Sequence, residues 1–288
     1  MSEPVWISAR VRLVPEVSSS ADLRADALAG RLFELGAEGF EWREDQRPVE
    51  VVVAFPLEDL QGQEDLRAGI IAALETDAEL VELSRFEDVD WAHHWRAHFT
   101  PLDFGPLWVV PSWLEAPTQA EAVLRVDPSS AFGTGLHPTT AMCLRAVVDR
   151  RPERILDVGT GTGILALAAV RLGGTGVGID NDPEAIRVAM ENRIINQVQP
   201  AALALSTTPV EAIAERFPFV VANILAGPLI ELAPAIAATV ARGGTLLLSG
   251  LLDAQAAEVE AAYRREGLEP TGGARDGEWA RLDLVRPG

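Results

Sequence analysis

The sequence predicts an α/β fold: a mostly parallel sheet with helices on both faces over residues 107–288, preceded by a smaller α+β domain. From residue 107 onward, short apolar segments alternate with amphipathic helical ones, which is typical of a parallel sheet covered on both faces. Residues 5–13 instead alternate between apolar and polar side chains, as in a strand with one buried face. The length of 288 residues suits two domains better than one.

The first domain is predicted over residues 1–87 as a β-α-β-β-α-β unit. Its expected elements, in chain order, are a strand at 5–13, a helix at 21–35, strands at 39–42 and 49–55, a helix at 64–74 and a strand at 79–86. This is the split βαβ order of ferredoxin-like domains. Because no residue in it belongs to a catalytic cluster, we interpret the domain as a substrate-recognition module. A purely supporting role for the second domain is the alternative.

A linker made of a short helix and a loop is predicted over residues 88–106. One face of the helix carries aromatic residues spaced four apart, Trp91, Trp95 and Phe99. His94 and His98 share this spacing, but no third ligand accompanies them, so we predict no metal site. The aromatic face is expected to pack between the domains.

The second domain is predicted over residues 107–288. Its expected strands, in chain order, lie at 108–111, 122–126, 154–158, 176–180, 201–205, 219–223, 245–249, 269–275 and 279–285. The last two strands follow each other without a long crossover. They are therefore expected to form an antiparallel edge of the parallel sheet.

Composition limits the classes of partner. The net charge is −19, so a broad basic face for nucleic-acid phosphates is not expected. An acidic surface suits a basic protein partner, although it also serves plain solubility. The single cysteine, Cys143, fits a reducing compartment. We find no secretory signal pattern and no apolar segment of roughly 18 residues, so we expect a cytoplasmic protein without a membrane span.

A glycine-rich loop follows the strand at 154–158. It reads Asp157-Val158-Gly159-Thr160-Gly161-Thr162-Gly163 and leads into an apolar helix that starts at Ile164. Glycines permit a tight turn and close approach of a ligand, and the helix N-terminus presents free N–H groups. Dinucleotides and S-adenosylmethionine both bind at such loops. The dinucleotide fingerprint has its third glycine where Ile164 stands. The Asp-x-Gly-x-Gly-x-Gly form at 157–163 instead resembles the first motif of class I S-adenosylmethionine-dependent methyltransferases, and that resemblance implies S-adenosylmethionine as the ligand. A turn that binds no ligand is the remaining alternative.

Asp180 closes the next strand, at 176–180. A carboxylate at this place accepts hydrogen bonds from the two ribose hydroxyls of a bound nucleotide. Because both ligand classes contain a ribose, Asp180 supports an adenosine group without choosing between them.

Asn223 follows the strand at 219–223, at the carboxyl end where ligands bind in open α/β sheets. Its side-chain carbonyl could accept an N–H of a substrate amine and aim the nitrogen lone pair at a methyl donor. Asn223 is therefore the first candidate for orienting a substrate. An asparagine also suits a helix N-cap before Gly227-Pro228, and one residue could do both.

Residues 127–140 read Asp127-Pro128-Ser129-Ser130-Ala131-Phe132-Gly133-Thr134-Gly135-Leu136-His137-Pro138-Thr139-Thr140. They strongly resemble a loop of the bacterial methyltransferases that modify ribosomal protein L11. The family's loop reads Asp-Pro-x-x-Ala-Phe-Gly-Thr-Gly-x-His-Pro-Thr-Thr. Further segments similar to this family lie at 33–36, 91–99, 157–163, 178–180, 222–226 and 278–279. The resemblance touches the whole chain and is most specific from 127 to 226.

The resemblance implies a Rossmann-like class I methyltransferase domain with a seven-stranded sheet. Such an enzyme transfers methyl groups from S-adenosylmethionine to lysine ε-amines and the N-terminal α-amine of ribosomal protein L11, and a monomer is expected. The implied catalytic residues are Asn223 and Phe132. The implied cofactor-binding residues are Thr134, Thr140, Asp157, Gly159, Gly161, Gly163, Asp180 and Asn223, with Phe132 and Thr134 in a loop that covers the cofactor.

Three other functions stay open at this point. A methyltransferase of another nitrogen, in RNA, DNA or a small molecule, is disfavoured by the acidic composition. Ile224 and Leu225 also stand where many amino methyltransferases carry Pro-Pro-aromatic after the asparagine. A non-catalytic binding module is disfavoured by the retained Asp157, Asp180 and Asn223. A nicotinamide-dependent dehydrogenase is disfavoured by Ile164.

Overall fold

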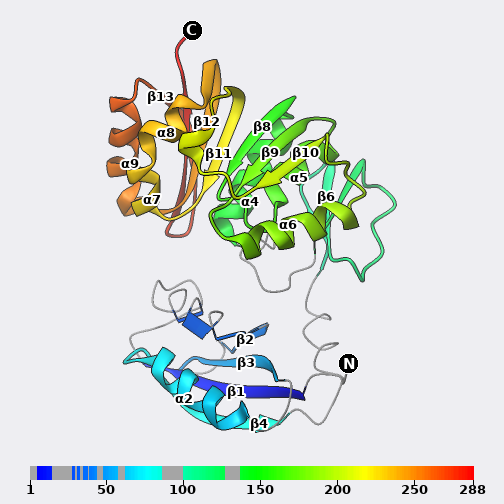
Figure 1. Cartoon of the computed structure of the whole chain (residues 1–288), viewed down its shortest axis with the longest axis vertical. Helices are drawn as coiled ribbons and strands as arrows, with labels where there is room; N and C mark the ends of the chain where they lie inside the picture. Colours follow the sequence, from blue (N-terminus) through cyan, green and yellow to red (C-terminus); the bar gives the residue numbers. More distant parts are fainter. Residues whose placement is uncertain are drawn as a thin grey trace. The chain divides into compact units, whose positions relative to one another are not determined.

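A computed structural model of the chain divides into two compact units, residues 1–99 and 100–288 (Figure 1). The structure describes residues 5–14, 28–29, 31–32, 35–37, 39–43, 48–57, 62–85, 100–126 and 137–288. Among these described residues, the first unit has one hydrophobic core, and the second has two that lie on opposite faces of its main sheet.

A four-stranded antiparallel sheet forms the first unit, in the order β2-β3-β1-β4. Its described elements are β1 (Val5–Leu13), β2 (Gly39–Arg43), β3 (Glu50–Leu57), α2 (Gln63–Leu74) and β4 (Ala78–Arg85). Alternate residues of β1, from Ile7 to Leu13, are buried in one core with Ile70 and Leu74 of α2. The helix α2 therefore covers one face of this sheet (Figure 1).

These five elements lie within two residues of their predicted positions. The helix predicted at 21–35 lies mostly outside the described residues, of which 28–29 and 31–32 are helical. The antiparallel pairing agrees with a split βαβ arrangement. The ferredoxin-like classification itself stays a prediction, because the first helix is described only in fragments.

A small sheet opens the second unit. Its strand β5 (Leu102–Asp103) pairs antiparallel with β6 (Leu107–Val110), which pairs parallel with β7 (Ala122–Arg125). Gly105, at a φ of +80°, makes the turn between β5 and β6, and its N–H donates to Asp103 at 2.7 Å. Residues 100–106, predicted as linker, therefore belong to this unit. The remaining linker residues, 88–99, with their aromatic and histidine pattern, lie outside the described residues.

The main sheet has seven strands in the order β10-β9-β8-β11-β12-β14-β13. They are β8 (Arg154–Val158), β9 (Thr175–Ile179), β10 (Leu203–Ser206), β11 (Phe217–Asn223), β12 (Val240–Leu252), β13 (Glu269–Asp276) and β14 (Trp279–Val285). Neighbours from β10 to β12 are parallel, whereas β14 is antiparallel to both β12 and β13. The predicted mostly parallel sheet with an antiparallel edge is confirmed.

Helices cover both faces of the main sheet (Figure 1). They are α4 (Pro138–Arg150), α5 (Ile164–Arg171), α6 (Pro183–Ile195), the 3₁₀ turn η2 (Val210–Ala212), α7 (Ala226–Glu231), α8 (Ala233–Ala238) and α9 (Asp253–Arg265). Phe219 and Val221 of β11 share a core with α4, α5 and α6, whereas Val220 and Ala222 share one with α7, α8 and α9. Because successive side chains point to opposite faces, such a strand is a continuous apolar run.

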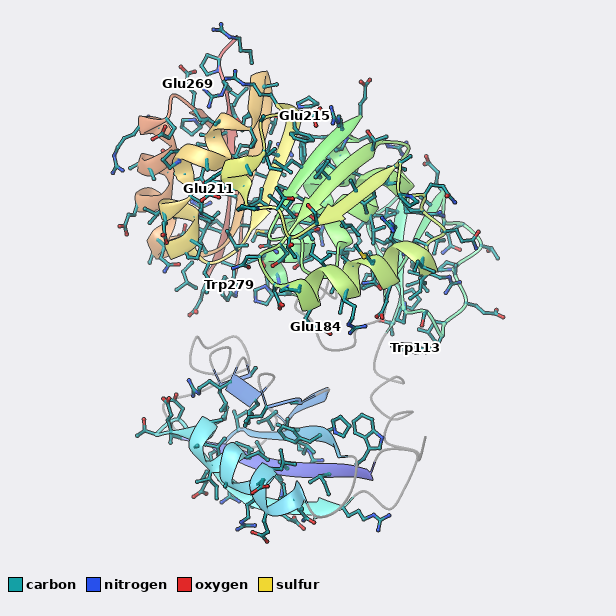
Figure 2. The ribbon with its side chains drawn as sticks, viewed as in Figure 1. Trp113, Glu184, Glu211, Glu215, Glu269 and Trp279 are labelled. Atoms are coloured by element: carbon teal, nitrogen blue, oxygen red, sulfur yellow. The ribbon has the colours of Figure 1, made fainter. Side chains whose placement is uncertain are left out.

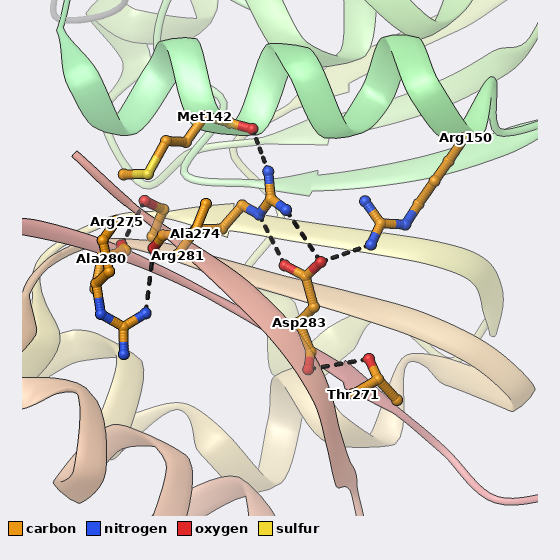
Figure 3. A network of polar contacts seen from close by, with 9 residues as sticks. Met142, Arg150, Thr271, Ala274, Arg275, Ala280, Arg281 and Asp283 are labelled. Carbon is orange, nitrogen blue, oxygen red and sulfur yellow. Dashed lines mark hydrogen bonds and ion pairs between the residues drawn. The ribbon is translucent and has the colours of Figure 1, made fainter.

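An ion-pair network ties α4 to β14 (Figure 3). Nε of Arg281 donates to Oδ1 of Asp283 at 2.7 Å, and Nη2 of Arg150 donates to Oδ2 at 2.5 Å. Arg281 also donates to the backbone carbonyl of Met142 at 2.5 Å. Asp283 is buried, and removing one partner of a buried pair typically costs about 3–5 kcal/mol. The network therefore holds α4, and with it Thr140 of its first turn, against the sheet.

The first turn of α4 is also fixed by His137. Its side chain caps the helix by accepting the N–H of Thr139, and burial lowers the pKa of His137, which favours the neutral ring that can accept. The His137 ring packs edge-on against Trp279 at 4.7 Å between ring centroids. Trp279, labelled in Figure 2, begins β14.

Candidate active site

Three candidate segments meet at the carboxyl edge of the main sheet. The strands β8, β9 and β11 are neighbours, with Asp157 in register with Gly178 of β9 and with Val221 of β11. The glycine-rich loop follows β8, Asp180 follows β9, and Asn223 ends β11. The parallel sheet thus brings together residues that are far apart in the sequence, as ligand sites in open α/β sheets require.

The glycine-rich loop has a backbone that other residues would not readily adopt. Gly159, Gly161 and Gly163 have φ values of +70°, +53° and +79°. The N–H groups of Gly159 and Thr160 both donate to the carbonyl of Ile179 at 2.9 Å, which fastens the loop to β9. A Cβ added at Gly159 would lie 2.2 Å from Cγ2 of Ile224, so this turn is also closely packed.

Asp157 lies in β8 just before this loop, with 1 % of its surface exposed. Its Oδ2 accepts the hydroxyl of Thr160 at 2.8 Å and the N–H of Ala166 at 3.2 Å. Burial raises the pKa of Asp157 to about 7, the two hydrogen bonds oppose this shift, and the charge of Asp180 adds to it. Asp157 therefore braces the loop and the start of α5, while its Oδ1 has no hydrogen-bond partner among the described residues.

Asp180 is half-buried beside the loop. Its Oδ2 accepts the N–H of Gly161 at 2.9 Å, and its Oδ1 accepts the N–H of Asp182 at 3.1 Å. These bonds set the orientation of the carboxylate. Asp180 keeps further lone pairs with which it can accept the hydroxyls of a ribose.

Asn223 faces the first turn of α4. Its Nδ2 donates to Oγ1 of Thr140 at 3.2 Å, and Thr140 is 3 % exposed. The Oδ1 atom of Asn223 is buried and has no partner among the described residues. The alternative role of Asn223 as a helix N-cap is wrong, because α7 begins at Ala226 and its N-cap is Leu225. The turn after β11 is two residues longer than the N-cap assignment required.

Thr140, Asp157, Gly159, Gly161, Gly163, Asp180 and Asn223 thus all lie at or beside the carboxyl edge of the sheet. The other two predicted site residues, Phe132 and Thr134, lie outside the described residues. Within the described ranges, no group of three or more His, Cys, Asp or Glu could hold a metal ion, and no helix is long and apolar enough to cross a membrane.

Two residues with a part in the site were missed from the sequence. Thr160 holds Asp157 through its hydroxyl, and Ile224 packs against Gly159. The spacing of three between Asp157 and Thr160 fits a turn and could have indicated the first contact. The second joins the turns after two different strands, so only the pairing of β8 with β11 reveals it.

The site suits S-adenosylmethionine. This ligand carries an adenosine ribose, a positively charged sulfonium and amine, and a carboxylate. Asp180 matches the ribose, the buried and unpartnered Oδ1 of Asp157 suits a cationic ligand, and the N-terminus of α5 suits the carboxylate. The sheet order, the glycine-rich loop and these acidic residues define a class I S-adenosylmethionine-dependent methyltransferase.

Comparisons with known proteins place the chain within that class. The family model described as Ribosomal protein L11 methyltransferase (PrmA) matches residues 19–287. The ribosomal protein L11 methyltransferase of Azotobacter vinelandii is 40 % identical over 98 % of this chain and 99 % of its own, and that of Geobacter sulfurreducens is 40 % identical over 89 % and 92 %. The crystal structure of a ribosomal protein L11 methylase from Lactobacillus delbrueckii subsp. bulgaricus has a TM-score of 0.60 and 30 % identity, and covers 66 % of this chain and all of its own. The chain belongs to the ribosomal protein L11 methyltransferase family.

Proposed function

We propose that this protein transfers methyl groups from S-adenosylmethionine to ribosomal protein L11, at lysine ε-amines and at the N-terminal α-amine. Membership of the family supports the substrate, since the relatives in Azotobacter and Geobacter bear that name over nearly their whole length. The acidic balance of the chain, −19, suits a basic substrate protein.

The observation that carries this proposal is the free carbonyl of Asn223. Its amide nitrogen donates to Thr140, which leaves Oδ1 without a partner among the described residues. A buried acceptor of this kind is costly unless a ligand completes it. An amine N–H is a fitting donor, because a hydrogen bond to Oδ1 fixes the direction of the nitrogen lone pair.

The chemistry requires a neutral acceptor amine. Lysine has a reference pKa of about 10.4, so its ammonium group must lose a proton before transfer. Bound S-adenosylmethionine supplies an electrophilic methyl group. In the transfer, the amine lone pair would form the new N–C bond as the C–S bond breaks, which would give a methylammonium group and S-adenosylhomocysteine as the leaving group; the one proton released is the proton that the ammonium group lost to solvent beforehand. Asn223 contributes by holding the nitrogen in line, since orientation can supply much of a rate enhancement.

The other assignments complete the proposal. Asp180 accepts the ribose hydroxyls, the glycine-rich loop receives the methionine end, and Phe132 and Thr134 belong to the segment assigned to cover the cofactor. The domain at 1–87 recognises the substrate, and the linker joins it to the catalytic domain. We place the enzyme in the cytoplasm, as a monomer that makes no direct contact with nucleic acid.

The test is mass spectrometry of purified ribosomal protein L11 after incubation with the enzyme and S-adenosylmethionine. Wild-type enzyme should add methyl groups that peptide mapping places on lysine or on the α-amine. Asn223→Ala should lower turnover roughly 100-fold, while calorimetry shows a smaller change in affinity for S-adenosylmethionine. Gln199→Ala is the control. Gln199 carries an exposed amide and lies before the amino end of β10, whereas the candidate site lies at the carboxyl edge of the sheet.

Two results would contradict the proposal. If the enzyme binds the cofactor but ribosomal protein L11 gains no mass, the methyl acceptor is another molecule. A large loss of cofactor affinity with unchanged turnover in Asn223→Ala would remove the orienting role of this residue.

A further inference from the structure

Leu225 is an exposed apolar residue at the edge of the site. Its side chain is 69 % exposed, whereas its neighbour Ala226 is buried and Ile224 packs against Gly159. Leu225 follows Asn223 by two residues, so their Cα atoms are at most about 7 Å apart. Its backbone carbonyl accepts the N–H of Leu229 at 3.1 Å in the first turn of α7, which holds the residue in place.

Single exposed apolar residues are ordinary on protein surfaces, and position is what distinguishes Leu225. The large apolar side chains exposed in the described parts of the chain are Leu35, Ile71, Met190, Ile194 and Leu225. Leu35 and Ile71 belong to the first unit, and Met190 and Ile194 lie on α6. Of these five, Leu225 alone lies in the turn that begins at Asn223.

The neighbouring acceptor atom indicates what Leu225 would contact. A lysine that brings its amine to Oδ1 of Asn223 must carry its methylene stem past the rim of the site. Such stems bury themselves along apolar surface while the nitrogen keeps its polar partner. An α-amine is attached directly to the first Cα of a chain and has no such stem.

We infer that Leu225 is a specificity-determining residue that packs against the methylene stem of the acceptor lysine. This inference rests on the proposed function. Two residues of one turn then have different roles. Asn223 orients the nitrogen of any acceptor amine, whereas Leu225 favours amines that are carried on an aliphatic side chain.

The experiment compares two kinds of amine in one substrate molecule. Ribosomal protein L11 is incubated with S-adenosylmethionine and either wild-type enzyme, Leu225→Ala, Leu225→Met or Ile194→Ala. Peptide mapping follows the initial rate of methylation at lysine and at the α-amine separately. Ile194→Ala is the matched control, because Ile194 is 70 % exposed and lies near the end of α6, away from the turn after β11.

Leu225→Ala should lower kcat/KM at lysine roughly tenfold and leave the α-amine within about twofold, since removing apolar contact to a few methylenes has effects of this size. Leu225→Met should retain lysine methylation, and Ile194→Ala should match the wild type at both amines. In all three variants, the affinity for S-adenosylmethionine and the Tm should stay unchanged. Equal losses at both amines, or no loss at lysine, would overturn the role of Leu225 alone. Absence of methylation of either amine by the wild-type enzyme would instead overturn the proposed function, and this inference with it.

Discussion

The turns that follow β8 and β11 lie side by side at the carboxyl edge of the sheet, and they are built differently. The turn after β8 is closed by backbone bonds to Ile179, by glycines at positive φ and by the buried Asp157. In the turn after β11, Asn223 has one side-chain hydrogen bond to Thr140, its carbonyl is free among the described residues, and Leu225 is exposed.

Under the proposed function, this difference assigns cofactor binding to the first turn and turnover to the second. A turn whose own contacts already hold its shape loses little entropy when a cofactor binds. Under the proposed function, the unfilled acceptor and the exposed apolar side chain of the second turn are contacted only when the substrate binds. Changes in the first turn should therefore affect stability and cofactor affinity, and changes in the second should affect turnover.

The largest effect is expected from Gly159→Ala. The φ of +70° and the 2.2 Å approach to Ile224 together predict a loss of roughly 2–5 kcal/mol in the free energy of unfolding. S-adenosylmethionine should no longer bind measurably. Urea denaturation and calorimetry provide the readouts, and Gly227→Ala is the control, because nothing lies within 4 Å of its added Cβ. Equal behaviour of the two variants would show that the turn after β8 tolerates a side chain.

The next effect is a pH dependence from Asp157, whose pKa of about 7 in the folded state compares with 3.8 ordinarily. Between these values the folded state binds more protons than the unfolded state, so this group lowers stability as pH rises from about 4 to 7 and has no further effect above. Asp157→Asn lacks this ionisation. As the pH rises from about 4 to 7, the free energy of unfolding of Asp157→Asn should therefore increase relative to that of the wild type by up to roughly 4 kcal/mol. Urea denaturation without cofactor measures this difference, and a constant gap at every pH would contradict it.

The smallest effect is expected from Thr140→Val, which removes the hydroxyl that holds the amide of Asn223. Turnover should fall roughly tenfold, the change that corresponds to losing one hydrogen bond of about 1.4 kcal/mol. Thr239→Val is a suitable control. Thr239 is also buried, but it lies just before β12 and its hydroxyl donates to the backbone carbonyl of Ile236. Single-turnover kinetics separates the two variants. An unchanged rate in Thr140→Val would mean that Asn223 is oriented without this contact.

Local patterns predicted most of the strands to within two residues, and turns less well. Among the predicted strands, the exception is β12 (Val240–Leu252), which begins five residues before and ends three residues after the predicted strand at 245–249. The strands β8 and β14 have the predicted bounds, because apolar runs between turn residues are a local signal. Asn223 was left with two roles, orienting group or helix N-cap, because an asparagine before a short helix suits both. The structure decided between them by starting α7 at Ala226. Gly105 was taken as part of a linker, because a glycine marks a turn without showing which strands the turn connects.

Residue order along the chain was enough to predict the class of fold, the cofactor loop and the candidates Asp157, Asp180 and Asn223, since each depends on a pattern within a few residues. Tertiary structure alone decided that Thr140 meets Asn223, that Ile224 closes over Gly159 and that Arg281 and Asp283 hold α4 to the sheet. These contacts join residues that lie between 65 and 139 positions apart in the sequence. They follow from the order of the strands in the sheet and from the packing of α4 against it, which no local pattern encodes.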